Sequence, residues 1–256
     1  MCMKLKLLIF QPLIWLILSG VFETATPQQI VQTDMFTFVR IKYNSGGAGY
    51  AFRMRFNTDS WEVDYPTAEE NFLRGLRTVM QLPVADLALA MTFTDPDIFK
   101  YPFAYMLEVG YLKFSQAEAD TLREWCLRGG FLMIDDFHGT GEWENFINEF
   151  GKAFPDRSPV QLPSTHPIFH GYYDFDGLPR VPGLGPLSIG RLYERDGYYP
   201  ECWGIFDDNK RLMVLINHNV DIGDSWEHAA DSRYPPAFSK LGYKLGINYI
   251  VYALTH

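Results

Sequence analysis

Apolar and polar residues alternate over residues 35–43 (MFTFVRIKY), and many of them are β-branched or aromatic. This period of two predicts a β-strand. Residues 45–49 contain three glycines and predict a loop. Apolar runs at residues 84–93, 103–109 and 131–134 predict further strands, although residues 84–93 would also suit a helix. Residues 131–134 are continuously apolar, so we expect that strand to be covered on both faces.

Two segments carry the pattern of an amphipathic helix that opens with a capping box. Thr67 is followed three residues later by Glu70, and apolar residues then recur at helical spacing from residue 72 to residue 80. Ser115 and Glu118 repeat the box before an apolar face that includes Cys126, and glycines at 129 and 130 end that helix. The second helix lies between two predicted strands. This order predicts parallel strands with right-handed crossovers, and therefore an α/β protein.

The second half of the chain is less regular. Residues 143–150 predict a short helix, and the Pro- and Gly-rich residues 155–186 predict irregular structure. A final helix is expected over residues 238–254, because its apolar residues form one stripe that would pack on the sheet. The stripe consists of Ile247, Ile250, Val251 and Leu254.

Three late apolar runs, at residues 187–193, 203–206 and 212–216, predict strands. The turn sequence Asp-Asp-Asn at residues 207–209 separates the last two runs. Aspartate and asparagine favour tight turns, so we expect these two strands to form a β-hairpin at one end of the sheet.

The N-terminus has the order of a secretory signal. Lys4 and Lys6 precede an apolar run from Leu7 to Val21, and small and polar residues follow. We therefore expect residues 1–25 to be a signal peptide, with an uncleaved anchor as the alternative because the run is only slightly short of a bilayer span. No cysteine follows Gly20, which argues against a lipoprotein. The expected location is outside the cytoplasm, in the periplasm or secreted.

The charge of the chain excludes some partners. Loss of residues 1–25 removes two lysines and one glutamate, so the net charge of −9 would become −10. A field of this sign repels phosphate backbones and anionic lipids. We therefore expect no nucleic acid partner, and membrane contact only through a possible uncleaved N-terminal segment. No repeat or linker-like segment divides the remaining chain, which predicts one domain over residues 35–254.

In an open parallel sheet, ligands bind at the carboxyl ends of the strands, where loops and helix N-termini converge. Two predicted strand ends are unusually polar here. The strand at 131–134 is followed by Asp135, Asp136 and His138, and the strand at 212–216 is followed by His218, Asn219, Asp221, Asp224 and Trp226. These residues form a candidate binding site, in which His138 and His218 face one cleft if the two strands are neighbours.

Three roles stay open for this site. The first is binding of a small molecule, glycan or envelope protein without catalysis. The second is hydrolysis, with or without a metal, in which His138 and His218 act with Asp136 or Asp221. The third is structural: Asp136 caps the next turn through backbone N–H groups, and the histidines are hydrogen-bonded loop residues. The spacing matches no His-Glu-x-x-His motif or EF-hand loop, so no metal and no cofactor are assigned.

Other residues give weaker indications. Several aromatic residues fall in expected loops, where they would either stack on sugars or a partner protein, or anchor the loops. His166 and His170 are expected in a loop that lines the cleft. Whether Cys126 and Cys202 form a disulfide stays open, because the sequence does not place their Cα atoms within bonding distance.

Several segments together resemble an uncharacterised bacterial family, domain of unknown function 4159. They are residues 38–43, Trp61 with residues 64–66, residues 129–136 and residues 217–226, and the resemblance spans residues 35–254. Arg40 and Trp61 lie in these segments and complete the candidate binding set. The family is associated with exported or membrane-linked proteins, and it is grouped with the class I glutamine amidotransferase-like superfamily.

The resemblance implies a flavodoxin-like three-layer α/β/α sandwich with a mainly parallel sheet. It also implies where chemistry would differ from that of an amidotransferase. Such an enzyme would carry a cysteine at the turn where this chain has Phe137 and His138. It would also carry a late His-x-Glu motif, whereas in this chain the second residue after His218 is Val220. The resemblance therefore implies a domain that does not hydrolyse glutamine and that has turned the cleft to another use.

Overall fold

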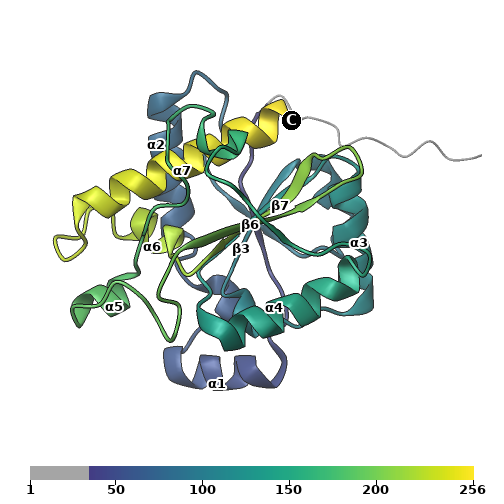
Figure 1. Ribbon diagram of the computed structural model, residues 1–256, viewed down its shortest axis with the longest axis horizontal. Coiled ribbons are helices and arrows are strands. Elements are labelled where there is room, and N and C mark those ends of the chain that lie inside the picture. Colours follow the sequence, from purple (N-terminus) through teal and green to yellow (C-terminus); the bar gives the residue numbers. More distant parts are fainter. Residues whose placement is uncertain (1–34) are drawn as a thin grey trace, which may run out of the picture.

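The computed structural model describes residues 35–256, so the expected signal peptide lies outside the described residues. Its centre is a seven-stranded sheet with the strand order β2-β1-β3-β4-β7-β6-β5 (Figure 1). The strands are β1 (Val39–Ile41), β2 (Leu89–Met91), β3 (Phe103–Leu107), β4 (Phe131–Asp135), β5 (Val160–Gln161), β6 (Glu201–Phe206) and β7 (Leu212–His218). The first five in spatial order are parallel, whereas β6 is antiparallel to β7 and β5 is antiparallel to β6.

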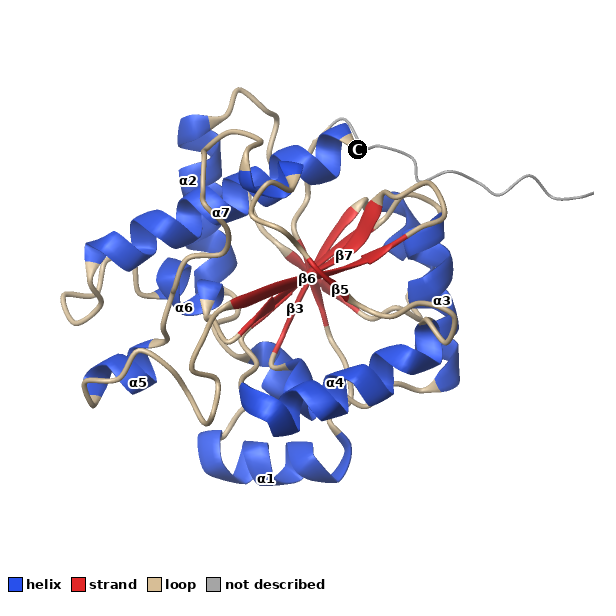
Figure 2. Ribbon diagram, viewed as in Figure 1, coloured by secondary structure: helices blue, strands red, loops and turns tan. Residues whose placement is uncertain are grey.

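Helices cover both faces of the sheet (Figure 2). One face carries α2 (Thr67–Val79), α6 (Ile222–Glu227) and α7 (Pro236–Thr255), and the other carries α3 (Gln116–Leu127) and α4 (Gly139–Ala153). The helices α1 (Gly46–Phe56) and α5 (Leu184–Ser188) lie at the periphery. Four 3-10 turns complete the order: η1 (Ser60–Glu62), η2 (Pro96–Lys100), η3 (Val109–Tyr111) and η4 (Pro167–Phe169). Within residues 35–256, no helix has both the length and the apolar character needed to cross a bilayer.

The core is divided by the sheet into two parts, because alternate residues of each strand point to opposite faces. In β4, Phe131 and Met133 pack toward α2, α6 and α7, whereas Leu132 and Ile134 pack toward α3 and α4. Every residue of β3, β4 and β7 is buried. This confirms the expectation that the apolar run at 131–134 is covered on both faces.

The strand register aligns the carboxyl ends of the central strands. Leu107 at the end of β3 pairs with Asp135 at the end of β4, and Ile134 pairs with Ile216 in β7. The segments that follow these three strands therefore begin at the same level along one edge of the sheet. This edge carries most of the candidate site.

The structure confirms most of the helices and strands that the sequence predicts. The central strands, the helix that begins after Ser115 and the long C-terminal helix all form, and residues 201–218 form the expected hairpin through the turn at 207–209. Residues 143–150 belong to a longer helix, α4, which already begins at Gly139. Residues 84–93 form only the short edge strand β2, and residues 35–43 contribute only β1 and a single bridge at Phe36.

Two expectations were wrong. The glycine-rich residues 45–49 open α1 and do not form a loop: Gly46 takes a left-handed φ of 53°, and the chain is helical from there on. Glycine permits such an entry without preventing the helix that follows. Residues 187–193 are not a strand but the end of α5 and a turn, and they are exposed, with Ile189 68% accessible. Without a neighbouring strand to supply backbone hydrogen bonds, this apolar run is not stabilised in an extended conformation.

The two cysteines within residues 35–256 are free. Cys126 in α3 packs on one side of the sheet and Cys202 in β6 packs on the other, and both are buried. Burial raises the pKa of both thiols far above the usual range, so both stay protonated. A disulfide between them is therefore excluded in this fold.

Candidate functional site

The edge formed by β3, β4 and β7 brings many carboxylates together. Glu108 follows β3, and Asp135 ends β4. Asp136 is the next residue, and Asp221 follows β7. Burial raises the pKa of all four carboxyl groups. Nearby carboxylates raise the pKa of Glu108, Asp136 and Asp221 further, because like charges disfavour one another's ionisation. The two polar strand ends predicted from the sequence are thus neighbours in space.

Asp135 has a structural role. Its side chain is fully buried, and its Oδ2 accepts hydrogen bonds from the backbone N–H groups of Ile222 (2.6 Å) and Gly223 (3.3 Å) at the start of α6. Asp221 caps the same helix by accepting from Asp224 N at 2.8 Å. Burial raises the pKa of Asp135 to about 7, although the hydrogen bonds from Ile222 and Gly223 lower it. Asp135 and Asp221 thus bind the start of α6. In the turn after β4, where Asp136 was expected to cap, Asn219 Oδ1 accepts from Gly139 N and Asp196 Oδ1 accepts from Thr140 N, both at 2.9 Å.

Asp136 faces His138 instead. The residue has a left-handed φ of 50°, and its Oδ1 lies 3.2 Å from His138 Nε2. Glu194 Oε1 lies 3.9 Å from the same nitrogen. His138 is only 4% exposed, and burial, followed by the nearby His218, lowers its pKa to about 3. The imidazole is therefore neutral at pH 7, in contact with carboxylates but not with solvent.

His218 lies in a different environment, among aromatic rings. Its ring centroid is 4.8 Å from that of Phe137 and 4.9 Å from that of Trp143. Its Nδ1 is 3.3 Å from Glu201 Oε2, and its Nε2 is 3.3 Å from the carbonyl oxygen of Gly139. Burial lowers the pKa of His218 in spite of these acceptors, so this ring is also neutral at pH 7.

A cavity of about 290 Å³ opens beside His218. Aromatic side chains and two carboxylates dominate its wall. The lining residues are Gly139, Thr140, Trp143, Asp196, Tyr198, Tyr199, Glu201, Trp203, His218 and Asn219. His138 does not line it. The two histidines expected to share one cleft are therefore close neighbours that face different surroundings.

Asn219 holds the wall of this cavity together. With a left-handed φ of 65°, it accepts a hydrogen bond from Gly139 N at 2.9 Å and donates one to the carbonyl oxygen of Tyr199, also at 2.9 Å. Its side chain thus connects the end of β7 to the start of α4 and to the loop that carries the exposed tyrosines. Of the candidate binding residues, His218 and Asn219 are the two that line the cavity.

Arg40, Trp61 and Trp226 lie elsewhere. Arg40 is fully buried and pairs with Glu69 (2.5 Å), while its Nη1 donates to the carbonyl oxygens of residues 61 and 63. Trp226 is fully buried and stacked on Phe72 with ring centroids 4.3 Å apart. Arg40 links β1 to α2, Trp226 links α6 to α2, and Trp61 packs against the core on the side of α3 and α4. All three residues therefore contribute to packing, and none of them lines the cavity.

His166 and His170 are also distant from the cavity wall. The ring of His166 lies 6.0 Å from that of Phe206, at the opposite end of β6, and 5.9 Å from that of Tyr252. His170 is exposed and pairs with Asp174. The expectation that this histidine pair lines the cleft was therefore wrong.

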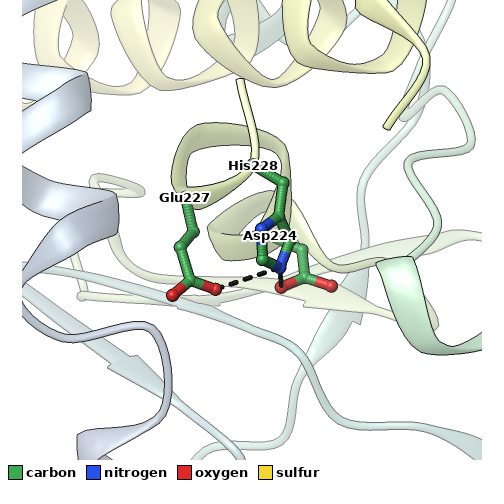
Figure 3. A group of neighbouring side chains, drawn as sticks. All are labelled: Asp224, Glu227 and His228. Atoms are coloured by element: carbon green, nitrogen blue, oxygen red, sulfur yellow. Dashed lines mark ion pairs between the residues drawn. The ribbon is translucent and has the colours of Figure 1, made fainter. Parts of the chain in front are cut away.

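Asp224 belongs to a second group of acidic side chains on α6. His228 Nε2 lies 3.3 Å from Asp224 Oδ1 and 3.1 Å from Glu227 Oε2, so one imidazole bridges two carboxylates (Figure 3). The hydrogen bond that His228 donates to Asp224 raises the pKa of the imidazole. The cationic form of the ring is therefore favoured, and it neutralises part of this group.

The sequence did not point to several residues of this region. Glu194 and Asp196 lie just beyond the strand expected at residues 187–193, and Asp64 was named only within residues 64–66 of the family resemblance. Trp203 lies in the expected strand, and its ring also lines the cavity. No local pattern marks these residues, because their positions depend on how the loop at 190–200 folds back over the strand ends.

The model of a family described as "Domain of unknown function (DUF4159)" matches residues 37–254, which is most of the chain. The chain belongs to the DUF4159 family. No significant match to a curated protein was found.

This DUF4159 domain has no cysteine at the turn after β4. The described cysteines lie in α3 and β6, and the turn itself carries Asp136, Phe137 and His138. Phe137 is buried against Trp143, Phe146 and His218. The site thus offers neutral imidazoles, carboxyl groups and aromatic rings.

Proposed function

We propose that this DUF4159 domain binds a neutral glycan in the cavity beside His218. The observation that carries the proposal is the composition of the wall. Tyr198 and Tyr199 are 52% and 75% exposed, and the rings of Trp143 and Trp203 lie 5.2 Å apart at the cavity. Exposed aromatic faces stack on the apolar faces of sugar rings, while carboxylates accept hydrogen bonds from sugar hydroxyls.

The charge of the wall supports a neutral ligand over an anion. The first backbone N–H groups of α4 point toward this region, yet Gly139 N already donates to Asn219 Oδ1 and Thr140 N to Asp196 Oδ1, both at 2.9 Å. Asp196 and Glu201 add negative charge. A phosphate or carboxylate ligand would therefore meet occupied donors and like charges.

The strand order supports a place for this domain in the class I glutamine amidotransferase-like superfamily, which we include in the proposal. Numbered along the chain, the parallel strands follow the order 2-1-3-4-5, which is that of flavodoxin-like sheets. Ligands of such sheets bind outside the carboxyl ends of the strands, where the cavity lies. Glutamine hydrolysis is not part of the proposal, because the turn after β4 lacks a thiol.

The geometry favours binding over the hydrolytic alternative. A hydrolase using His138 and His218 together would need both rings to reach one substrate. Only His218 lines the cavity, while His138 Nε2 contacts Asp136.

We also propose that the domain acts outside the cytoplasm, on the basis of the signal-like order of residues 1–25. An extracytoplasmic location would bring the cavity to envelope or extracellular glycans. Cell fractionation with N-terminal sequencing of the recovered chain tests this part, and recovery of the intact chain from the cytoplasm alone would refute it.

Binding of neutral oligosaccharides tests the function. Hexasaccharides of glucose, mannose and N-acetylglucosamine are titrated into the purified chain, with the fluorescence of Trp143 and Trp203 as the signal. For the hexasaccharide that binds, we expect Tyr199→Ala to weaken binding about three- to tenfold, since one aromatic contact contributes about 0.5–1.5 kcal/mol. Tyr172→Ala removes another exposed tyrosine, 51% accessible against 75% for Tyr199, that does not line the cavity, and it serves as the control.

Two results would contradict the proposal. One is the absence of binding by any of these neutral sugars at millimolar concentration. The other is equal affinity in Tyr199→Ala, Tyr172→Ala and the wild type, which would place the sugar elsewhere on the molecule.

A further inference from the structure

A second site is indicated by three carboxylates that converge from two distant parts of the chain. Asp64 lies between η1 and α2, Asp221 follows β7, and Asp224 lies in the first turn of α6. One oxygen of each lies within 4.8 Å of the other two. This triad is separate from the aromatic cavity, since none of its members lines that cavity.

The triad has little positive charge of its own. Arg40, a nearby guanidinium, makes its ion pair with Glu69. His228 contacts Asp224 through Oδ1, while Asp224 Oδ2 accepts from Leu184 N at 2.6 Å. Within residues 35–256, no lysine or arginine forms an ion pair with Asp64 or Asp221.

One buried oxygen of the triad, Asp64 Oδ2, has no hydrogen-bond partner among the described residues. The hydroxyl of Tyr105, whose side chain is fully buried, lies near it and interacts with the carboxyl group of Asp135. Both atoms crowd Gly223: a Cβ there would lie 3.1 Å from Tyr105 Oη and closer still to Asp64 Oδ2. A buried polar atom without a partner costs about 1–3 kcal/mol, so this arrangement favours a ligand that pairs with it.

Gly183 closes the other side of the triad. A Cβ at Gly183 would lie 2.5 Å from Asp221 Oδ2 and 3.1 Å from Asp224 Oδ2. The two oxygens therefore converge on a backbone position that has no side chain. Glu194 Oε1, 3.3 Å from the same point, adds a fourth carboxylate beside them.

We propose that Asp64, Asp221 and Asp224 bind one hard divalent cation of the Mg²⁺ or Ca²⁺ class. The donors are all carboxylate oxygens, which these cations prefer and which soft metals do not. The bound ion ties the loop before α2 to the start of α6, and so connects two segments that are far apart in sequence. The site is independent of the glycan cavity, and either can fail without the other.

Calorimetric titration of the purified, EDTA-treated full chain with Mg²⁺, Ca²⁺ and Zn²⁺ tests this site. We expect saturable binding of Mg²⁺ or Ca²⁺, and a rise in Tm of about 5 °C or more at a hundredfold excess over Kd. Asp64→Asn and Asp221→Asn keep the shape of the side chain and should weaken binding about tenfold or more. Asp231→Asn, which changes an aspartate paired with Arg233 beyond α6, is the matched control and should bind as the wild type does.

The location of the ion has its own readout. Crystals of the wild-type chain soaked in Mn²⁺ should give an anomalous peak between the three carboxylates, and this result does not depend on whether the variants fold. The proposal is overturned if neither Mg²⁺ nor Ca²⁺ binds below about 1 mM, a weak limit even for extracellular calcium modules. It is also overturned if the Mn²⁺ peak lies between Glu227 and His228, or if Asp64→Asn and Asp221→Asn bind as tightly as Asp231→Asn.

Discussion

His138 and His218 lie next to one another in the fold but differ in what surrounds their rings. His138 contacts the carboxyl group of Asp136, whereas His218 packs between Phe137 and Trp143. Burial lowers the pKa of both imidazoles, more strongly for His138. Desolvation thus outweighs the nearby carboxylates, because a charged ring would lose its hydration in either place.

The buried imidazole of His138 should make stability depend on pH. Its folded-state pKa of about 3 lies below the value of about 6.5 in the unfolded chain, so the unfolded chain binds the extra proton between these values. The contribution of His138 to the free energy of unfolding is therefore fully present above pH 6.5 and is lost as the pH falls toward 3. In urea unfolding, we expect the stability difference between wild type and His138→Gln to fall by about 2–3 kcal/mol from pH 6.5 to 4.5.

An exposed histidine gives the control for this experiment. Ser164 and Asp174 raise the pKa of His170, so its contribution is present below pH 6.5 and is lost as the pH rises through its folded-state pKa. His170→Gln should therefore change the pH dependence in the opposite direction and only weakly, because solvent screens the pair. A His138→Gln profile parallel to that of the wild type would show that the ring is not buried as a neutral group.

At the scale of elements, two helices have the same predicted capping box and only one forms it. The Ser115 side chain accepts from Glu118 N, and Glu118 Oε2 accepts from Ser115 N at 2.9 Å. Thr67 lies within α2 because the chain enters that helix at Pro66, and no side chain caps its start. Because the turn from Asp64 to Pro66 leads directly into α2, the helix begins one residue earlier than the capping box predicts.

This difference predicts unequal effects of two similar mutations. Ser115→Ala should lower the free energy of unfolding by about 1 kcal/mol, as loss of an N-cap does elsewhere. Thr67→Ala should change it by less than about 0.5 kcal/mol, because no capping hydrogen bond is lost. Urea denaturation of both variants under one condition measures this, and equal destabilisation would show that α2 is capped after all.

At the scale of the whole molecule, one sheet joins two apolar cores. Cys126 lies in the core toward α3 and α4, and Cys202 lies in the core toward α7. Since β3, β4 and β7 contribute side chains to both cores, neither core can open fully while the other stays intact. We expect both cores to unfold in a single cooperative step.

The two thiols report on this directly. In a Cys2→Ser background, both cysteines should resist a thiol reagent in the folded protein and should become reactive at the same rate in moderate denaturant. Mass spectrometry of the labelled peptides separates the two sites. Labelling of one cysteine well before the other would show that the two cores unfold separately.

The sequence by itself determined the class of this protein and much of its core. Apolar runs of strand length, the Ser115 capping box and the C-terminal helical stripe depend on neighbours along the chain, so local pattern was enough to predict them. The polar ends of β4 and β7 were also visible, because a change from apolar to polar residues marks where a strand leaves the core.

Only the tertiary structure decided how those polar residues group. The placement of Asp64 beside Asp221, and of Tyr199 beside His218, depends on loops crossing the sheet edge, and no local period encodes such a crossing. The same holds for His138 and His218, which lie at the ends of the neighbouring strands β4 and β7, yet one contacts the carboxyl group of Asp136 and the other packs among aromatic rings. Strand order and loop packing bring together residues far apart in the chain, and this is why the sites emerged from the fold and not from the sequence.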